Sequence, residues 1–339
     1  MTRQTVLLLF GGESTEHDVS VTSARNVYAA CDNEKYDIKL CYIDKSGHWW
    51  LLDSWTENPV NHRDGQLFAA LGAGGFMVIP SGATLHVDVI LPILHGKNGE
   101  DGTVQGLAQL LHIPIVGCDV TASATAMDKT LTKQVLEANG IKTVEYEVYN
   151  KGNDLPQYAD LVNRFNSGHM FVKPSRSGSS VGVRKVHDES EFMPAIENAL
   201  QYDSRILIER AIVGRELETA VLGNPPSHIV SGIGEVIPGA EFYDYDDKYA
   251  ADSKSQVKLD AELDPELTAR IRDTSKRAYA LLGCTGLARI DYLLEGDTFY
   301  VIEVNTLPGF TNISMYPKLW RESGIRYAEL IDKLIESAA

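Results

Sequence analysis

Two nearly uninterrupted apolar runs constrain the fold of this chain more than any other feature of its sequence. They cover residues 5–10 (TVLLLF) and residues 87–94 (VDVILPIL). Runs of this kind are typical of strands in a sheet whose two faces are both covered. Between them, residues 18–30 have helical spacing, residues 36–43 alternate as a second strand, and residues 49–52 follow as its hairpin partner. The first third of the chain is therefore predicted to be α/β, with a mostly parallel sheet.

The pattern after this region indicates an α+β organisation, in which strands alternate with loops and helices. Three strands are predicted at residues 170–173, 205–209 and 216–222. A β-hairpin follows, with strands at residues 287–294 and 298–305. Three lobes are predicted, covering residues 1–125, residues 126–210 and residues 211–339.

Apolar spacing also predicts two helices in these later regions. The first covers residues 127–139, with Met127, Leu131 and Val135 on one face and Gly140 as its stop. The second ends the chain and carries one apolar stripe. That stripe consists of Tyr327, Leu330, Ile331, Leu334 and Ile335.

The charge balance and the cysteines exclude several classes of protein. The chain has 31 Lys and Arg against 47 Asp and Glu, a net charge of −16. General binding to nucleic acid or to an anionic membrane needs a basic surface, so neither partner is expected. The four cysteines stand far apart without a CxxC pair, which argues against a zinc ribbon or a disulfide framework. No signal peptide or membrane-spanning run is recognised, so a soluble, cytoplasmic protein is expected.

The predicted hairpin carries the most informative side chains. Because positions i and i+2 share one face of a strand, Arg289 and Asp291 point one way, as do Glu303 and Asn305. A turn near Asp297 sets Asp291 opposite Glu303, so two carboxylates and an amide converge beside a guanidinium. Oxygen ligands of this kind suit Mg²⁺. Taken alone, the pattern fits an exposed face with ordinary salt bridges equally well.

Three glycine-rich segments add to this candidate site. Gly309 follows the hairpin, and its backbone N–H together with Arg289 would form an oxyanion hole. Residues 173–182 (KPSRSGSSVG) have the composition of a phosphate-covering loop, or of a flexible surface loop. Residues 95–106 (HGKNGEDGTVQG) begin where a buried strand ends, which favours a ligand site over a simple loop-capping His. No P-loop motif occurs, and residues 11–15 (GGEST) do not fit a dinucleotide-binding fingerprint.

Taken in order, these segments resemble the D-alanine–D-alanine ligase family of the ATP-grasp superfamily. The resemblance is carried mainly by HGKNGEDGTVQG and by LLGCTGLARIDYLLEGDTFYVIEVNTLPG. GGESTEHDVS, KPSRSGSSVG, FYDYDDKY and PGFTNISMYPKLW match in the same order, so the similarity covers essentially the whole chain. The resemblance implies a three-lobed ATP-grasp architecture.

The resemblance also implies roles for residues that bind and activate the amino-acid substrates. Glu16 would anchor the ammonium group of the first D-alanine in a network with Ser179 and Tyr249. Arg289 and the Gly309 amide would hold the tetrahedral oxyanion. The residues expected near substrate carboxylates or the transferred phosphoryl group are His95, Lys248 and Ser314. A lid is expected at residues 241 to roughly 258, where Tyr249 and the other tyrosines would otherwise be plain core contacts.

For the nucleotide and its metal ions, the resemblance implies a second group of residues. Lys129 and Lys173 would contact the ATP phosphates, beneath a loop that includes Ser180. Glu209, Glu216 and Arg210 would lie at the adenine or ribose, Arg210 in a position where many relatives carry Lys. Two Mg²⁺ ions, which Mn²⁺ could replace, would be bound by Asp291, Glu303 and Asn305. A requirement for a monovalent cation stays open, and a homodimer is expected.

The expected reaction is the ATP-dependent ligation of two D-alanine molecules for peptidoglycan precursor synthesis. A carboxylate is a poor acyl donor, so transfer of the γ-phosphoryl group to give an acyl phosphate would precede attack by the second amine. Ligation of D-alanine to D-serine or D-lactate is the nearest alternative, and Lys248-Tyr249 argues against lactate. A nucleotide-binding regulatory protein without catalysis is the alternative from another class.

Overall fold

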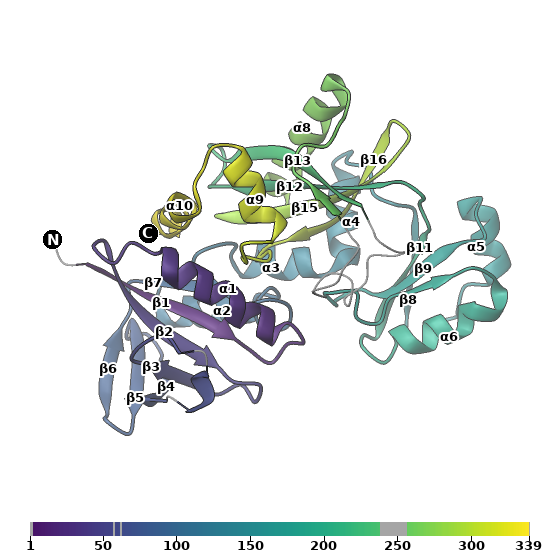
Figure 1. Ribbon diagram of the computed structural model, residues 1–339. Helices are drawn as coiled ribbons and strands as arrows, with labels where there is room; N and C mark the ends of the chain where they lie inside the picture. The colour runs from purple at the N-terminus through teal and green to yellow at the C-terminus, as the bar shows by residue number, and fades with distance from the viewer. Residues whose placement is uncertain (1–2, 57, 62, 238–255, 339) are drawn as a thin grey trace.

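The computed structural model describes residues 3–56, 58–61, 63–237 and 256–338, which form three lobes, each built on its own β-sheet (Figure 1). The N-terminal sheet has seven strands, the next has four and the last has five. This mixed α/β and α+β architecture agrees with the fold class predicted from the sequence. Residue 125 falls within helix α3 (Val120–Met127), and residue 210 is the last of strand β11 (Arg205–Arg210).

The N-terminal sheet is mixed, in the order β6-β5-β4-β3-β2-β1-β7. Only β1 pairs in parallel, with β2 and β7, and the other four pairs are antiparallel. The prediction of a mostly parallel sheet was therefore wrong. Three of the four connections among the strands from β2 to β6 are too short for a crossover helix, and the longest, between β3 and β4, contains the short 3₁₀ turn η1 (Pro59–Asn61), so successive strands reverse direction. The strands are β1 (Gln4–Gly11), β2 (Tyr36–Ile43), β3 (Trp49–Leu52), β4 (Gly65–Ala70), β5 (Gly75–Ile79), β6 (Ala83–His86) and β7 (Val89–Ile93).

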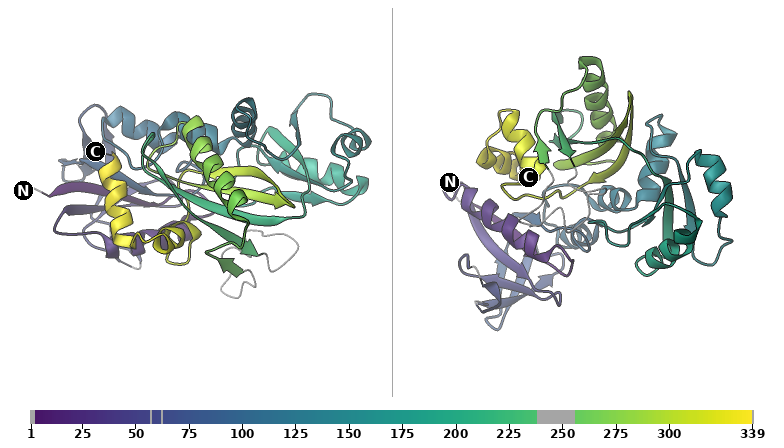
Figure 2. Two further views of the ribbon diagram at one scale, coloured as in Figure 1. Left: turned by 90° about the horizontal axis from the view of Figure 1, so that it is seen from above. Right: turned by 45° about the vertical axis from the view of Figure 1, so that its right-hand side comes forward.

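The C-terminal helix returns to the N-terminal lobe. Helix α10 (Tyr327–Ala338) lies against α1 (His17–Ala30), as Figure 1 and Figure 2 show. Its Leu330, Ile331, Leu334 and Ile335 share one apolar core with the buried side chains of β1. The predicted apolar stripe is confirmed, and it joins the two ends of the chain. The other helices near this lobe are the short 3₁₀ turn η1 (Pro59–Asn61) and α2 (Thr103–Leu111).

The helix predicted at residues 127–139 is present, but it begins two residues later than predicted, after a corner at Asp128. Helix α3 ends at Met127, and α4 (Lys129–Ala138) begins after Asp128, whose carboxylate accepts hydrogen bonds from two backbone N–H groups of α4. The predicted face was also wrong, because Leu131 is 41% exposed while Lys133 is buried. A buried ion pair overrides the apolar periodicity at this helix.

The central lobe is a four-stranded antiparallel sheet in the order β10-β9-β11-β8. Helices α5 and α6 cover the face of this sheet that points away from the other lobes (Figure 1). The elements are β8 (Tyr146–Asn150), α5 (Tyr158–Phe165), β9 (Met170–Pro174), β10 (Arg184–Val186), α6 (Glu189–Ala199) and β11.

The C-terminal lobe is an antiparallel sheet in the order β14-β13-β12-β15-β16. Its register confirms the predicted hairpin, because Asp291 lies opposite Glu303 and Arg289 lies opposite Asn305. Helix α8 packs on β12 and β13, and α9 packs on the same two strands. The elements are β12 (Arg215–Leu222), β13 (Ile229–Ile237), β14 (Gln256–Lys258), α8 (Pro265–Leu281), β15 (Leu287–Glu295), β16 (Thr298–Asn305) and α9 (Met315–Glu322).

Two further features bear on the class of protein. All four cysteines (Cys31, Cys41, Cys118 and Cys284) are buried free thiols. Across the described ranges, the model contains no helix with the length and apolar character needed to span a membrane.

Candidate active site

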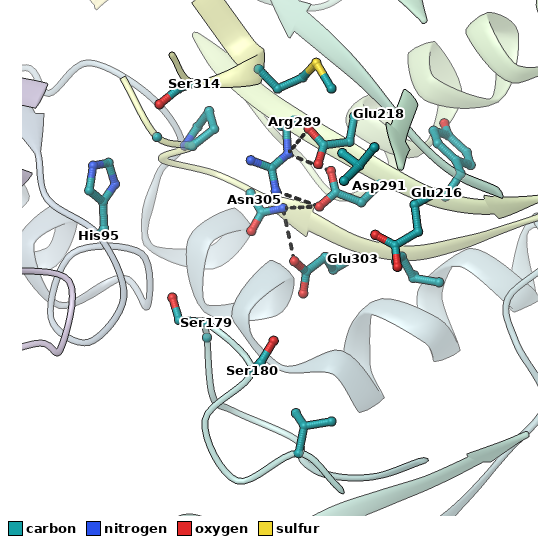
Figure 3. Close-up of a pocket in the computed structure, with 18 of the residues that line it drawn as sticks. His95, Ser179, Ser180, Glu216, Glu218, Arg289, Asp291, Glu303, Asn305 and Ser314 are labelled. Carbon is teal, nitrogen blue, oxygen red and sulfur yellow. Dashed lines mark hydrogen bonds and ion pairs between the residues drawn. The ribbon is translucent and has the colours of Figure 1, made fainter. Parts of the chain in front are cut away.

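A cavity of about 1210 Å³ is bounded by residues of all three lobes. All fifteen predicted site residues that lie in the described ranges line this cavity, although they come from segments far apart in the chain. Figure 3 shows several of them, including His95, Ser179 and Arg289. Tyr249 and Lys248 fall outside those ranges, as does most of the predicted lid. The tertiary structure thus brings the predicted residues together, while their individual roles stay predictions.

The hairpin of β15 and β16 presents its polar face to the cavity. Arg289 donates from Nε to Asp291 Oδ1 and from a terminal nitrogen to Asp291 Oδ2, both at 2.7 Å. Asn305 Nδ2 donates to Asp291 Oδ2 at 3.0 Å and lies 3.4 Å from Glu303 Oε1. The alternative of an exposed hairpin face does not hold, because the Asp291 side chain is only 9% exposed.

Glu218, which the sequence analysis missed, adds a third carboxylate to this group. It lies opposite Asp291 on the neighbouring strand β12, and its Oε2 is 3.0 Å from Arg289 Nε (Figure 3). We call Arg289, Asp291, Glu218 and Glu303 the carboxylate cluster. Burial lowers the pKa of Arg289, but Asp291 and Glu218 outweigh this effect and hold it well above its usual value. The i, i+2 spacing of Glu216 and Glu218 was the signal that could have found it.

A second polar group lies where α1 meets the loop after β7. Glu16 precedes α1 and is buried, and His95 is buried beside it with Nδ1 3.0 Å from the Leu307 carbonyl oxygen. Burial lowers the pKa of His95, partly opposed by the charge of Glu16, so the imidazole is neutral at pH 7. Glu100, also missed, accepts a hydrogen bond from the Gly96 N–H at 3.0 Å. Burial and the neighbouring Glu16 raise the pKa of Glu100 to about 8.

The serine-glycine loop is anchored at its start and lines the cavity. Ser175 donates to the Asp128 carboxylate at 2.7 Å, and Lys129 Nζ donates to the Ser177 carbonyl at 2.8 Å. Ser179 and Ser180 both have positive φ, at 51° and 58°, a conformation uncommon for residues other than glycine. These contacts argue against the alternative of an independent surface loop. The role of Asp128 was missed because its partner is 47 residues away.

The end of the cavity next to the central lobe has a buried group of charges beside it. Glu209 Oε1 lies 2.8 Å from Lys133 Nζ, and its other oxygen pairs with Lys173. Lys133 Nζ also donates to the Val144 carbonyl at 3.1 Å. Burial raises the pKa of Glu209, but the two lysines outweigh it and hold the pKa at about 2. We call Lys133, Lys173 and Glu209 the lysine cluster.

Arg210 lies at the rim of the cavity, paired with two carboxylates. Its Nε donates to Glu145 at 2.7 Å, and its two terminal nitrogens donate to Glu295 at 3.0 and 2.9 Å. Glu295 belongs to the hairpin of the C-terminal lobe, so these bonds tie that lobe to the central one. Contact with adenine, the predicted role, would use the flat face of this guanidinium.

The turn after the hairpin is closely packed around Gly309. A Cβ atom at this position would lie 2.9 Å from Ser314 Oγ, so a larger residue would force the turn to move. Ser314 Oγ in turn accepts the Thr311 N–H at 3.0 Å. The close fit explains why glycine suits this position in the cavity lining.

Comparison with known proteins agrees with this geometry. The family model for the C-terminus of D-ala D-ala ligase matches residues 135–336, and the model for its N-terminus matches residues 5–118. A D-alanine–D-alanine ligase from Ruminiclostridium cellulolyticum is 42% identical over 100% of this chain and 96% of its own length.

Solved structures of related ligases have the same fold as this chain. The VanG D-Ala:D-Ser ligase from Enterococcus faecalis matches with a TM-score of 0.90 and 33% identity, over 100% of both chains. The D-alanine–D-alanine ligase from Bacillus anthracis, solved in complex with ATP, has a TM-score of 0.76 at 28% identity, over 99% of this chain and 97% of its own. With its fold, its cavity and its sequence in agreement, the chain belongs to the D-alanine–D-alanine ligase family, an ATP-grasp family.

Proposed function

We propose that this protein joins two D-alanine molecules into D-alanyl-D-alanine, with ATP converted to ADP and phosphate, for peptidoglycan precursor synthesis. One observation carries the proposal. A single cavity is lined by Lys129 and Lys173, which suit phosphates, by the carboxylates of Asp291 and Glu303, which suit divalent cations, and by the buried carboxylate of Glu16, which suits an ammonium group. Phosphoryl transfer to an amino acid requires these three sites to be adjacent.

The chain's own residues would activate the first D-alanine without a protein nucleophile. Glu16 would hold its ammonium group, while Lys129 and Lys173 would bring the γ-phosphoryl group of ATP to its carboxylate. The resulting acyl phosphate has a good leaving group. When the second amine attacks, Arg289 and the Gly309 N–H would stabilise the negative charge on the carbonyl oxygen.

The donor set of the hairpin fits Mg²⁺. Asp291 and Glu303 lie opposite each other, and a rotation of the Asn305 amide would present its oxygen beside them. No three His, Cys, Asp or Glu side chains among the described residues form a metal-binding group, so nucleotide phosphates would complete the coordination. Bound there, Mg²⁺ or Mn²⁺ would offset the charge of the transferring phosphoryl group.

The second substrate has one competing candidate. The likeness to VanG, a D-Ala:D-Ser ligase, favours D-serine as the alternative nucleophile. The residues expected to discriminate, Lys248 and Tyr249, lie outside the described ranges. D-Alanine remains the proposed substrate, because the chain is 42% identical to a curated D-alanine–D-alanine ligase.

A competition experiment tests both parts of the proposal. The protein is given ATP, Mg²⁺ and an equimolar mixture of D-alanine, D-serine and D-lactate at pH 7, and the products are identified by mass spectrometry. D-Alanyl-D-alanine should dominate, with one ADP and one phosphate released per dipeptide. A dominant D-serine or D-lactate product would overturn the substrate assignment, and AMP with pyrophosphate would mean adenylation instead.

Two further expectations belong to this proposal. A cytoplasmic location follows from the need for ATP, and a homodimer follows from the family resemblance. Size-exclusion chromatography with light scattering would test the homodimer directly, since a monomer and a dimer of a 37.3 kDa chain are easily resolved.

A further inference from the structure

Arg289 lies between two carboxylates that come from neighbouring strands. On β15, Asp291 accepts two hydrogen bonds from its guanidinium at 2.7 Å. On β12, Glu218 lies opposite Asp291 in the register, with Oε2 3.0 Å from Arg289 Nε. The Arg289 and Glu218 side chains are only 18% and 12% exposed, so both are largely shielded from water. The same guanidinium nitrogen is therefore within reach of either carboxylate.

These contacts create a conflict at Asp291. The proposed function asks its carboxylate to bind a divalent cation, yet both of its oxygens accept hydrogen bonds from Arg289. An oxygen that coordinates a cation is a weaker acceptor for a guanidinium, because the two positive charges repel. If Asp291 were the sole partner of Arg289, metal binding would release the residue that stabilises the oxyanion.

We infer that Glu218 is a positioning residue that keeps Arg289 aimed into the cavity when Asp291 turns to the metal ion. The inference rests on the proposed function, because it assigns Asp291 to the metal. Glu218 acts through Arg289, and it supplies an acceptor whose position is set by a different strand. Glu218 would also strengthen metal binding, because it competes with Asp291 for the guanidinium and so leaves the Asp291 oxygens available to the metal ion.

Two variants of Glu218 separate positioning from a simple effect of charge. Glu218→Gln keeps the length of the side chain and an oxygen acceptor but removes the negative charge. Glu218→Asp keeps the charge but withdraws the acceptor by one methylene group. Positioning predicts that Asp is at least as defective as Gln, whereas a charge effect predicts that Asp behaves like wild type.

The matched control is Glu235→Gln. Glu235 on β13 makes a two-pronged pair with Arg215 at 2.7 and 2.8 Å, on the same sheet and outside the cavity lining. Thermal unfolding of each variant reports whether it is folded. Both Glu218 variants retain a polar side chain of similar shape, so they are expected to unfold within a few degrees of wild type.

The readouts are turnover and metal affinity. Mn²⁺ binding is followed by the EPR signal of free Mn²⁺ with ADP as the nucleotide, a measurement that needs no catalysis. Glu218→Asp is expected to lose about 10- to 100-fold in kcat and to bind Mn²⁺ more weakly, the usual range for a residue that orients a site from its second layer. KM for ATP should change by less than about twofold, because the lysine cluster is untouched.

Each outcome has a distinct meaning. Wild-type kcat and Mn²⁺ affinity in Glu218→Asp would overturn the inference, as would a loss confined to Glu218→Gln. If wild type itself forms no dipeptide from D-alanine and ATP, the proposed function fails first. If wild type forms the dipeptide and both Glu218 variants keep wild-type kcat and Mn²⁺ affinity, only the positioning role of Glu218 is wrong.

Discussion

The lysine cluster and the carboxylate cluster both contribute residues to the same cavity but are built differently, and Lys133 is the one cluster member that is buried outside the lining. The lysine cluster has two cations and one anion, a net charge of +1, and each Glu209 oxygen pairs with a lysine. The carboxylate cluster has one cation and three anions, a net charge of −2. Lys129 adds a further cation beside the carboxylate cluster, because its Nζ lies 3.5 Å from Glu303.

The difference in net charge indicates which kind of ligand each end of the cavity favours. Buried charge is stable only when it is compensated, so an excess of one sign favours a ligand of the other. The positive end suits nucleotide phosphates, and the negative end suits divalent cations. ATP bound with Mg²⁺ carries both groups, so one ligand would compensate both clusters.

The largest expected effect comes from removing the single cation of the carboxylate cluster. Arg289→Ala should lower kcat by about 10²–10³-fold, the usual loss for one oxyanion-hole donor. ATP binding, measured by calorimetry, should persist because the lysine cluster is intact. The matched control is Arg215→Ala, which removes a paired arginine of the same sheet away from the cavity. Turnover near wild type in folded Arg289→Ala would show that Arg289 is structural.

A smaller effect is expected from the lysine cluster. Lys133→Met keeps the volume but removes one of the two charges that hold Glu209, so the unfolding free energy should fall by about 3 kcal/mol, the lower end of the usual range for breaking a buried ion pair. A loss of about 1 kcal/mol in nucleotide binding would raise KM for ATP about fivefold and leave KM for D-alanine unchanged. These quantities are measured by urea unfolding and steady-state kinetics.

Lys333→Met serves as the control for this variant. Lys333 forms an i,i+4 pair with Glu329 on the surface of α10, where its side chain is 45% exposed. A surface pair of this kind contributes little to stability. Equal effects of the two substitutions would mean that the burial of Lys133 has no bearing on the nucleotide site.

The last effect concerns stability and its dependence on pH, and it is expected at Glu100, the carboxyl group that adds to the negative end only when it ionises. Its pKa is raised to about 8 from 4.5, so the folded state binds more protons than the unfolded state between these pH values. Its contribution to stability is therefore lost as pH rises from about 4.5 to about 8. Glu100→Gln mimics the neutral acid and should remove this loss.

The measurement is urea unfolding of wild type and Glu100→Gln from pH 5 to pH 9, without nucleotide or metal. Wild type should lose stability relative to the variant across this window, and the difference should level off above pH 8. Glu329→Gln, on the surface of α10, is the control. A pH-independent difference between wild type and Glu100→Gln would contradict the raised pKa.

Local patterns predicted most of the elements and part of the site, and the family resemblance supplied the other predicted site residues. The hairpin register, the buried strands and the C-terminal stripe follow from side-chain periods of two and 3.6 residues, which act over a few neighbours. The motifs around His95, Arg289 and Gly309 also named the lining of the cavity. Each motif could be found from short-range spacing, but only the fold brings the motifs to one cavity.

Long-range packing decided the rest. The helix break at Asp128 and the burial of Lys133 depend on Ser175 and Glu209, which are distant in sequence. The direction of the N-terminal strands depends on the length of the connections and on which strands pair. An apolar run predicts a buried strand in either case, so it does not indicate the direction. Glu218 and Glu100 became visible only where strands and loops converge. A charged side chain carries no local sign of being buried, because burial depends on which partners the tertiary structure brings within hydrogen-bonding distance.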